Sequence, residues 1–256
     1  MTLPTEIVKA GGGSPLSMIL YGPPKIGKTE ALAALSRESN FLMLDLENGS
    51  EHVDALKIKV NDFEELTSVG SAIMKAKNPY TGLIVDTATE LESWCEWDAT
   101  EMYMASPMGK AFNSKAGQLL PKSQWDSVLT LPRGAGYLWH RLAFKKWKEK
   151  IDKLAKHKIY VAHVKDIFLE KEDKQISAKD LDLTGKIKNI ACGYVDAIGY
   201  LYRDPKNPLE LRVSFKNNNE DIAGSRSKHL RNQDFVLIEN NEDGSVKTSY
   251  WNKIFI

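Results

Sequence analysis

The spacing of apolar residues predicts strands that alternate with helices over the first two-thirds of the chain. Four short and almost continuously apolar runs are typical of strands covered on both faces, as in a parallel sheet; they span residues 18–21, 41–47, 81–87 and 158–163. Apolar residues recur at helical spacing in segments 28–37, 62–77, 90–105 and 136–157, and Asp62 stands at an N-cap position. This alternation predicts an α/β fold with a mainly parallel central sheet flanked by helices.

The last part of the chain has a different pattern. Residues 194–202 and 209–215 indicate a pair of strands, and residues 235–256 indicate a hairpin that turns at residues 241–244. We therefore expect an antiparallel end to the sheet. Between residues 106 and 136 the periodicity gives way to glycine, proline, lysine and serine, which predicts an insertion or mobile loop with a short helix near residues 124–129.

These patterns divide the chain into three parts. Residues 1–15 are expected to form a flexible arm, because they end in three consecutive glycines and a Ser-Pro pair, and the arm is a candidate subunit contact. Residues 16–231 contain the alternating strands and helices of a single core. Residues 232–256 form a C-terminal hairpin extension.

Composition narrows the class of protein only a little. The formal net charge is +1, so the whole chain has no excess charge that would attract nucleic acid or an anionic membrane. Cys95 and Cys192 are the only cysteines, and neither has a second cysteine or a histidine at metal-ligand spacing. No apolar run approaches membrane-spanning length, and the first residues lack the pattern of a signal peptide. We expect free thiols, no membrane partner and a cytoplasmic protein.

A phosphate-binding sequence follows the first apolar run. The pattern G-x-x-x-x-G-K-T is a P-loop, and here it reads Gly22, Pro23, Pro24, Lys25, Ile26, Gly27, Lys28 and Thr29. The glycines allow backbone N–H groups to point into one concavity, and the helix that follows adds the partial positive charge of its N-terminus. Lys28 is expected to bind the β- and γ-phosphates and the Thr29 hydroxyl to ligate Mg²⁺. The sequence therefore predicts a nucleoside triphosphate site.

Polar residues end three other predicted strands. Asp86 closes one apolar run, in the Walker B arrangement that orients Mg²⁺ directly or through water. Glu47 ends another, where a carboxylate can align and deprotonate the attacking water, and Asp45 on the same strand is the alternative for that role. His163 ends the fourth strand, either as a contact to the γ-phosphate or as a core histidine.

The ordered set of motifs resembles the RecA-like recombinase core. Within that superfamily it is most similar to the phage-encoded minimal RecA-like ATPases grouped with single-strand annealing proteins; the similar stretches are GPPKIGKT, LDLENG, LIVDT, VAH, LDLTGKIKN, VDAIGYLYR and GSRSKHLR. They extend from about residue 17 to residue 231. Histidine at position 163 departs from the glutamine that is usual there.

This resemblance implies a function and a set of roles. It implies an ATPase of DNA recombination that uses ATP and Mg²⁺ at the interface between subunits of a filament or ring, with Glu47 as the catalytic glutamate and His163 as the sensor. Residues 166–188 would match the second DNA-binding loop. Lys216 and Arg226 would be the candidates for a basic finger that reaches the ATP of the neighbouring subunit. Single-stranded DNA and a single-strand binding protein would be partners, in the cytoplasm of the host.

The residues alone support DNA binding less strongly. The predicted loop 165–188 holds six lysines and six acidic residues, and Phe168 is its one aromatic candidate for base stacking. Local positive clusters lie elsewhere, and each also fits an ordinary solvated surface. They are the segment with Arg226, Lys228, His229 and Arg231, the insertion with Lys110, Lys115 and Lys122, and the lysine-rich outer face of predicted helix 136–157.

Two alternatives remain from other functional classes. One is a nucleotide-gated ATPase that binds a protein of phage replication or packaging. The other is a small-molecule P-loop kinase, which the sequence disfavours because no arginine lies between Arg141 and Arg203, where a lid would follow the fourth strand. No N-K-x-D motif that reads guanine is present, which favours ATP over GTP.

Overall fold

The structure is a computed structural model that describes residues 13–171, 174–217 and 221–256, with the backbone alone between residues 167 and 178. Residues 1–12, which include most of the predicted arm, lie outside the described residues, as does the side chain of Phe168. Within the described ranges no helix is long and apolar enough to cross a membrane.

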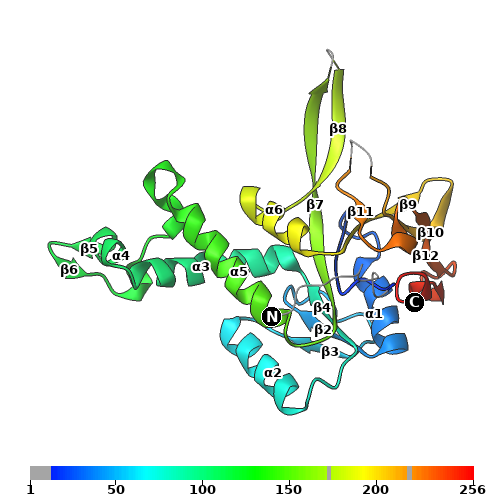
Figure 1. The fold of residues 1–256 in the computed structure, drawn as a ribbon, viewed down its shortest axis with the longest axis horizontal. Coiled ribbons are helices and arrows are strands. Elements are labelled where there is room, and N and C mark those ends of the chain that lie inside the picture. Colours follow the sequence, from blue (N-terminus) through cyan, green and yellow to red (C-terminus); the bar gives the residue numbers. More distant parts are fainter. Residues whose placement is uncertain (1–12, 172–173, 218–220) are drawn as a thin grey trace, which may run out of the picture.

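A single large sheet organises the chain (Figure 1). Its strand order is β13-β12-β10-β9-β1-β7-β4-β2-β3, and the strands from β9 to β3 run parallel. Beyond β9 the strands run antiparallel, as predicted. The bounds are β1 Ser17–Gly22, β2 Phe41–Asp45, β3 Lys57–Lys59, β4 Gly82–Asp86, β7 His157–Lys171, β9 Ala197–Asp204, β10 Asn207–Ser214, β12 Asp234–Asn240 and β13 Val246–Ser249.

Helices cover both faces of the sheet and create two apolar cores. One core joins the sheet to α2 (Phe63–Lys75), α3 (Ala88–Met104), α5 (Gly136–Ile151) and α6 (Gly185–Tyr194). The other core joins it to α1 (Lys28–Ser39) and to the C-terminal residues Trp251 and Ile254. Asp62 caps α2 by accepting a hydrogen bond from the N–H of Glu65, which confirms the predicted helix start. The mainly parallel sheet with flanking helices and an antiparallel end is therefore confirmed.

The predicted polar loop after residue 163 is wrong. Strand β7 continues past His163 to Lys171 and pairs with β8 (Lys174–Leu181) in an antiparallel hairpin, which stands clear of the rest of the sheet in Figure 1. Helix α6 follows at Gly185. Charged residues are frequent between residues 164 and 181, so the sequence lacks the long apolar run by which the other strands were predicted, whereas the backbone hydrogen bonds of a hairpin can form with any side chains.

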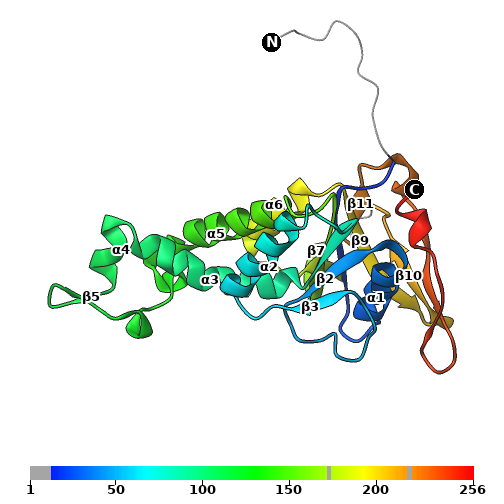
Figure 2. The same ribbon diagram turned by 90° about the horizontal axis from the view of Figure 1, so that it is seen from below.

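The segment between α3 and α5 is an insertion of short elements, in agreement with the broken pattern of the sequence. It contains α4 (Pro107–Phe112), a small hairpin of β5 (Ser114–Lys115) and β6 (Gln118–Leu119), and three 3₁₀ turns. The expected helix near residues 124–129 is replaced by two of these turns, Lys122–Gln124 and Val128–Thr130. Figure 2 shows that α3 and α5 carry this segment away from the sheet. We refer to α3, α5 and the residues between them as the α3–α5 arm.

The lysine-rich face of α5 is only partly an outer face. Lys148 is buried, where its ammonium pairs with Asp152 at 2.6 Å and lies over the rings of Tyr160 and Tyr194. Lys146 pairs with Asp98 at 3.0 Å. The sequence predicted a lysine-rich outer face for this helix, but a lysine can bury its aliphatic stem and its ammonium when a carboxylate and aromatic rings receive the charge.

Candidate active site

The P-loop connects β1 to α1 at the carboxyl edge of the parallel sheet. Gly22 ends β1, and a Cβ atom added there would lie 2.5 Å from the carbonyl oxygen of Leu201, so only glycine permits this approach of β9. Gly27 precedes α1 with a φ of 104°, and Lys25 also has a positive φ, of 62°. The backbone therefore turns sharply twice before the helix and leaves the first N–H groups of α1 facing the loop.

The side chain of Lys28 is hydrogen-bonded to the backbone at the start of this loop. Its Nζ donates hydrogen bonds to the carbonyl oxygens of Gly22 and Pro23, both at 2.9 Å, and the side chain is buried. Burial lowers the pKa of Lys28, while the carboxylates of Asp86 and Glu47 act in the opposite direction. Within the described parts of the chain no carboxylate forms a direct ion pair with Lys28. Its charge is therefore available to an anionic ligand such as a phosphate.

Asp86 and Thr29 form a pair of oxygen donors beside the loop. Asp86 ends β4, which is separated from β1 by β7, and its Oδ2 accepts a hydrogen bond from Thr29 Oγ1 at 3.2 Å. Burial raises the pKa of Asp86 to about 6, and the Glu47 carboxylate adds to this effect. These hard oxygen atoms fit Mg²⁺, which normally takes one or two protein ligands and completes its shell with water and phosphate. No group of three or more His, Cys, Asp or Glu suited to a metal is found in the described ranges.

Glu47 lies at the same edge of the sheet, just beyond β2. Its Oε1 accepts a hydrogen bond from Thr87 Oγ1 and lies 2.8 Å from His163 Nε2. The side chains of Glu47 and His163 are 31% and 32% exposed, so the pair faces a solvent-accessible space beside the P-loop. A fixed and partly hydrated carboxylate suits a general base that holds a water molecule. The structure thus joins Glu47 and His163, which the sequence placed separately on two strand ends.

Asp45 has a different position from Glu47. It is fully buried, and its carboxylate accepts hydrogen bonds from the N–H groups of Gly49 and Ser50 and from Ser50 Oγ at 3.1, 3.1 and 2.6 Å. These contacts fix the turn that follows β2 and leave the Asp45 carboxylate inside that turn. The geometry favours Glu47 over Asp45 for a role beside the phosphates.

Arg203 is a component of the site that sequence reasoning missed. It is the penultimate residue of β9, and its Nε donates to the carbonyl oxygen of Ile26 in the P-loop at 2.9 Å. Its Nη1 and Nη2 donate to Pro208 O at 2.8 Å and to Asn240 Oδ1 at 3.0 Å. Burial lowers the pKa of Arg203. The sequence did contain a feature that could have indicated Arg203, because it is a polar residue near the carboxyl end of a predicted strand.

The two candidate finger residues do not join this site within one chain. Arg226 lies near the start of β9: its N–H donates to Asp196 O, and its Nη2 donates to Gly193 O, at 2.7 and 2.9 Å. Since Ala197 pairs with Met18 at the beginning of β1, this is the opposite end of the strand from Gly22, about 13 Å away. Lys216 follows β10, where the antiparallel chain moves away from the P-loop edge. Neither residue can complete the P-loop of its own chain in this arrangement.

Comparisons with known proteins identify a family. Residues 14–227 match the family model described as AAA domain. No curated protein matches the sequence. Among solved structures, the fold is similar to the RadB recombinase, with 13% identity, a TM-score of 0.46 and 91% of each chain covered. It is also similar to a prototypical ATPase from the type III secretion system of pathogenic bacteria, with 10% identity and a TM-score of 0.44, over 86% of this chain and 59% of that one.

Proposed function

The chain belongs to the AAA domain family and is an ATPase with a RecA-like P-loop fold, and we propose that it couples ATP hydrolysis to the binding of single-stranded DNA in recombination. In this proposal ATP binds between adjacent subunits of a filament or ring. Bound ATP orders the elements that hold DNA for annealing or strand exchange, and hydrolysis releases them.

The proposed chemistry follows from the positions of the side chains. The loop from Gly22 to Thr29 binds the triphosphate, and Lys28 places its ammonium at the β- and γ-phosphates. Thr29 and Asp86 would hold Mg²⁺, which would neutralise charge on the phosphate oxygens. Glu47 orients the attacking water and accepts its proton, while Thr87 and His163 fix the Glu47 carboxylate.

One observation carries the proposal beyond ATP hydrolysis. His163 contacts Glu47, pairs with Gly22 across β1 and β7, and stands on the same strand that continues into the β7–β8 hairpin. The base of the hairpin is also tied to α3, because Thr89 Oγ1 accepts from His163 N–H and donates to Asp182 O, both at 3.3 Å. A change at the γ-phosphate therefore has a direct route to an element that projects into solvent. This supports the hairpin as the DNA-binding element that residues 166–188 are expected to contain.

The proposal also requires a neighbouring subunit. Lys216 and Arg226 lie away from the P-loop of their own chain and are exposed, Arg226 with 65% of its side chain. A basic residue supplied by the next subunit would stabilise the charge that develops on the transferred phosphoryl group. Together with the resemblance to the phage-encoded group, this favours self-association in a host cytoplasm and a single-strand binding protein as a further partner.

Stimulation of hydrolysis by DNA is the direct test. We expect the rate of Mg²⁺-dependent ATP hydrolysis to rise severalfold when single-stranded DNA is added, because DNA bound at the hairpin would act through His163 on the position of the Glu47 carboxylate. Phosphate release would be measured with and without DNA, with double-stranded DNA as the control. Equal rates under all three conditions would remove DNA from the function.

Charge reversal at Lys110, Lys115 and Lys122 tests whether the α3–α5 arm contributes to DNA binding. Lys110 and Lys115 are exposed, and Lys122 pairs with Glu101 at 2.7 Å. Removing three phosphate contacts should weaken single-stranded DNA binding about tenfold or more at low salt and reduce its salt dependence. Binding would be measured by fluorescence anisotropy, with reversal of exposed lysines 206 and 247 as a control. Unchanged affinity would exclude the arm as a DNA contact.

Arg203 should affect ATP binding more than turnover. Arg203→Met and Arg203→Lys each lose the guanidinium group, which donates hydrogen bonds to Ile26, Pro208 and Asn240. We therefore expect each variant to raise KM for ATP about tenfold, with a smaller change in kcat. Steady-state kinetics would separate the two constants. Arg212→Lys is the matched control, because Arg212 pairs with Asp234 on the neighbouring strands instead of contacting the P-loop. A normal KM in Arg203→Met would exclude this support of the loop.

A second candidate function is a nucleotide-gated ATPase whose partner is a protein of phage replication or packaging. The observation in its favour is the arm of α3 and α5, which presents exposed hydrophobic side chains far from the nucleotide site; Trp97, Met108, Leu119, Tyr137 and Leu138 are examples. This candidate predicts ATP hydrolysis that DNA leaves unchanged. Phosphate release without an acceptor would exclude the third alternative, a small-molecule kinase.

A further inference from the structure

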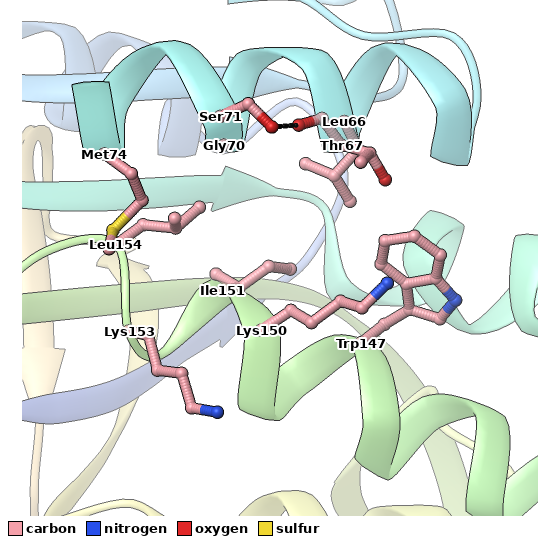
Figure 3. Close-up of a pocket in the computed structure, with 10 residues that line it drawn as sticks. All are labelled: Leu66, Thr67, Gly70, Ser71, Met74, Trp147, Lys150, Ile151, Lys153 and Leu154. Atoms are coloured by element: carbon pink, nitrogen blue, oxygen red, sulfur yellow. Dashed lines mark hydrogen bonds between the residues drawn. The ribbon is translucent and has the colours of Figure 1, made fainter. Parts of the chain in front are cut away.

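An apolar groove of about 440 Å³ lies between α2 and the C-terminal half of α5 (Figure 3). Leu66, Gly70 and Met74 line it from α2, and Trp147, Ile151 and Leu154 line it from α5 and the residues that follow. The floor is well packed, since Leu66, Ile151 and Leu154 are almost fully buried. Met74 at one end is 54% exposed, and a flexible thioether side chain is common at surfaces that adapt to a bound peptide.

Gly70 keeps the middle of the groove open. It lies in the interior of α2, where glycine costs about 1 kcal/mol of helix stability relative to alanine. Packing does not demand this glycine, because an added Cβ would lie 3.4 and 3.5 Å from the two Leu154 methyl groups, in ordinary contact. A larger side chain at position 70 would therefore extend into the groove and fill it.

The charges that line the groove are all positive. Lys150 and Lys153 stand on the α5 side, no carboxylate lines the groove, and neither lysine forms an ion pair within the described ranges. The pKa of Lys150 is lowered by burial and by the nearby Lys146 ammonium. An incoming carboxylate would relieve this repulsion and complete the charge balance of the groove.

The aromatic content of the groove disfavours a nucleic-acid ligand. Among the described residues that line the groove, Trp147 has the single aromatic ring, and this ring already stacks on Phe63 with a centroid distance of 3.8 Å. The Lys150 ammonium lies 3.8 Å from the centroid of the same Trp147 ring. Figure 3 shows the two side chains next to each other. A nucleobase would find no open ring on which to stack, whereas an aliphatic or aromatic side chain can enter the space between Met74, Gly70 and Ile151.

The groove is also remote from the nucleotide site. Leu154 closely precedes His157, which pairs with Gly82 at the start of β4, whereas Asp86 and the P-loop lie at the other ends of these parallel strands. A ligand in the groove would leave the phosphates uncovered.

We propose that this groove binds a short acidic segment of a partner protein that inserts a large apolar side chain between α2 and α5. The apolar residue occupies the floor beside Gly70 and Met74, and flanking carboxylates pair with Lys150 and Lys153. The inference does not depend on DNA being a ligand of the protein. It assigns to the chain a surface that recruits a partner independently of the state of the ATP site.

Peptide binding to the full chain tests the proposal. The probe is a fluorescein-labelled peptide with a Leu-Phe pair flanked by Asp and Glu, and the comparison peptides replace the acidic residues by Lys or the Leu-Phe pair by Ser. We expect saturable binding of the acidic apolar peptide only. Lys150→Glu combined with Lys153→Glu should weaken it about tenfold, the effect of losing two surface ion pairs and adding repulsion. Lys145→Glu with Lys156→Glu, an equal change of charge outside the groove, should not weaken it.

Gly70→Phe provides an independent check. It should abolish peptide binding and leave ATP hydrolysis unchanged, which would show that the variant is folded. Equal binding of the acidic and lysine peptides, or full binding by Gly70→Phe, would overturn the proposal. Absence of peptide binding by the wild type would also overturn the proposal if Gly70→Phe changed another interaction. Loss of self-association in sedimentation velocity would then identify a second copy of the chain as the occupant, and loss of DNA affinity would identify DNA.

Discussion

Replacement of Glu47 by glutamine should lower the rate of ATP hydrolysis by about 10²- to 10⁴-fold while ATP still binds. Glutamine keeps the size of the side chain and an oxygen that can accept the Thr87 hydroxyl, so the local structure should persist. It cannot accept a proton from water, and the general-base contribution is lost. Single-turnover hydrolysis and equilibrium binding of ATP, measured on the same preparation, would separate the chemical step from nucleotide binding.

The control for this variant is Glu51→Gln. Glu51 lies in the same segment after β2 but is exposed and pairs with Lys59 at 2.6 Å, so its loss should leave hydrolysis unchanged. His163→Ala should fall between the two, because it removes one of the two contacts that orient Glu47. If Glu47→Gln retained a substantial share of the wild-type rate, the base would have to be another group, and Asp45 is too enclosed by its own turn to replace it.

Replacement of Asp86 by asparagine should stabilise the nucleotide-free protein and abolish Mg²⁺-dependent hydrolysis. Asp86 has a raised pKa of about 6, so the folded state binds its proton more tightly than the unfolded state, whose aspartate pKa is about 4. The ionised carboxylate therefore costs stability, and the cost develops as the pH rises from about 4 to 6. Asparagine removes it, and we expect a gain of about 1–3 kcal/mol at pH 7.

Thermal unfolding between pH 4 and pH 8 would measure this effect. The wild type should lose stability relative to Asp86→Asn as the pH rises through this window, and the gap should be constant above about pH 7. Added Mg²⁺ and ATP should stabilise the wild type much more than the variant, because in the variant Thr29 would be the one ligand of the pair that remains for the ion, without the Asp86 carboxylate. If Asp86→Asn were less stable than the wild type at pH 7, the buried, ionised Asp86 carboxylate would not be destabilising the folded state as proposed.

Sequence reasoning succeeded where one local rule decides the structure. The P-loop glycines, the apolar run before Asp86 and the cap at Asp62 each depend on a few adjacent residues, and the structure confirms the fold that they predict. The same rules placed Glu47 and His163 at the ends of predicted strands, although β7 continues past His163 to Lys171, and they could not show that the two side chains meet. That contact depends on β7 lying beside β4, and strand order is a property of the whole sheet.

The misses have a common physical cause. Arg203 is 177 positions from Ile26 in sequence, and Lys148 lies over two rings from other elements in addition to its pair with Asp152 one turn away. A short window of sequence therefore contains neither Ile26 for Arg203 nor the two rings for Lys148. The β7–β8 hairpin is held by main-chain pairing, and its sequence sets a few apolar residues, such as Ile167, Leu169 and Ile176, among many charged ones, which is a weak signal for a strand. Polar residues with distant partners, and strands whose sequences are rich in charge, escape prediction from the hydrophobic pattern.

The continuity of β7 makes the hairpin a mechanical lever. Between His163 and Lys171 the chain contains no glycine or proline, and every residue from 164 to 171 pairs with β8, so no hinge interrupts the ribbon. Eight residues of extended chain span about 26 Å. A tilt of about 10° at His163 would therefore carry Lys171 through roughly 5 Å over that span. Loss of a contact to the γ-phosphate would shift His163 by much less than this, and the length of the strand would amplify that shift into a displacement comparable with the spacing of nucleotides along a single strand.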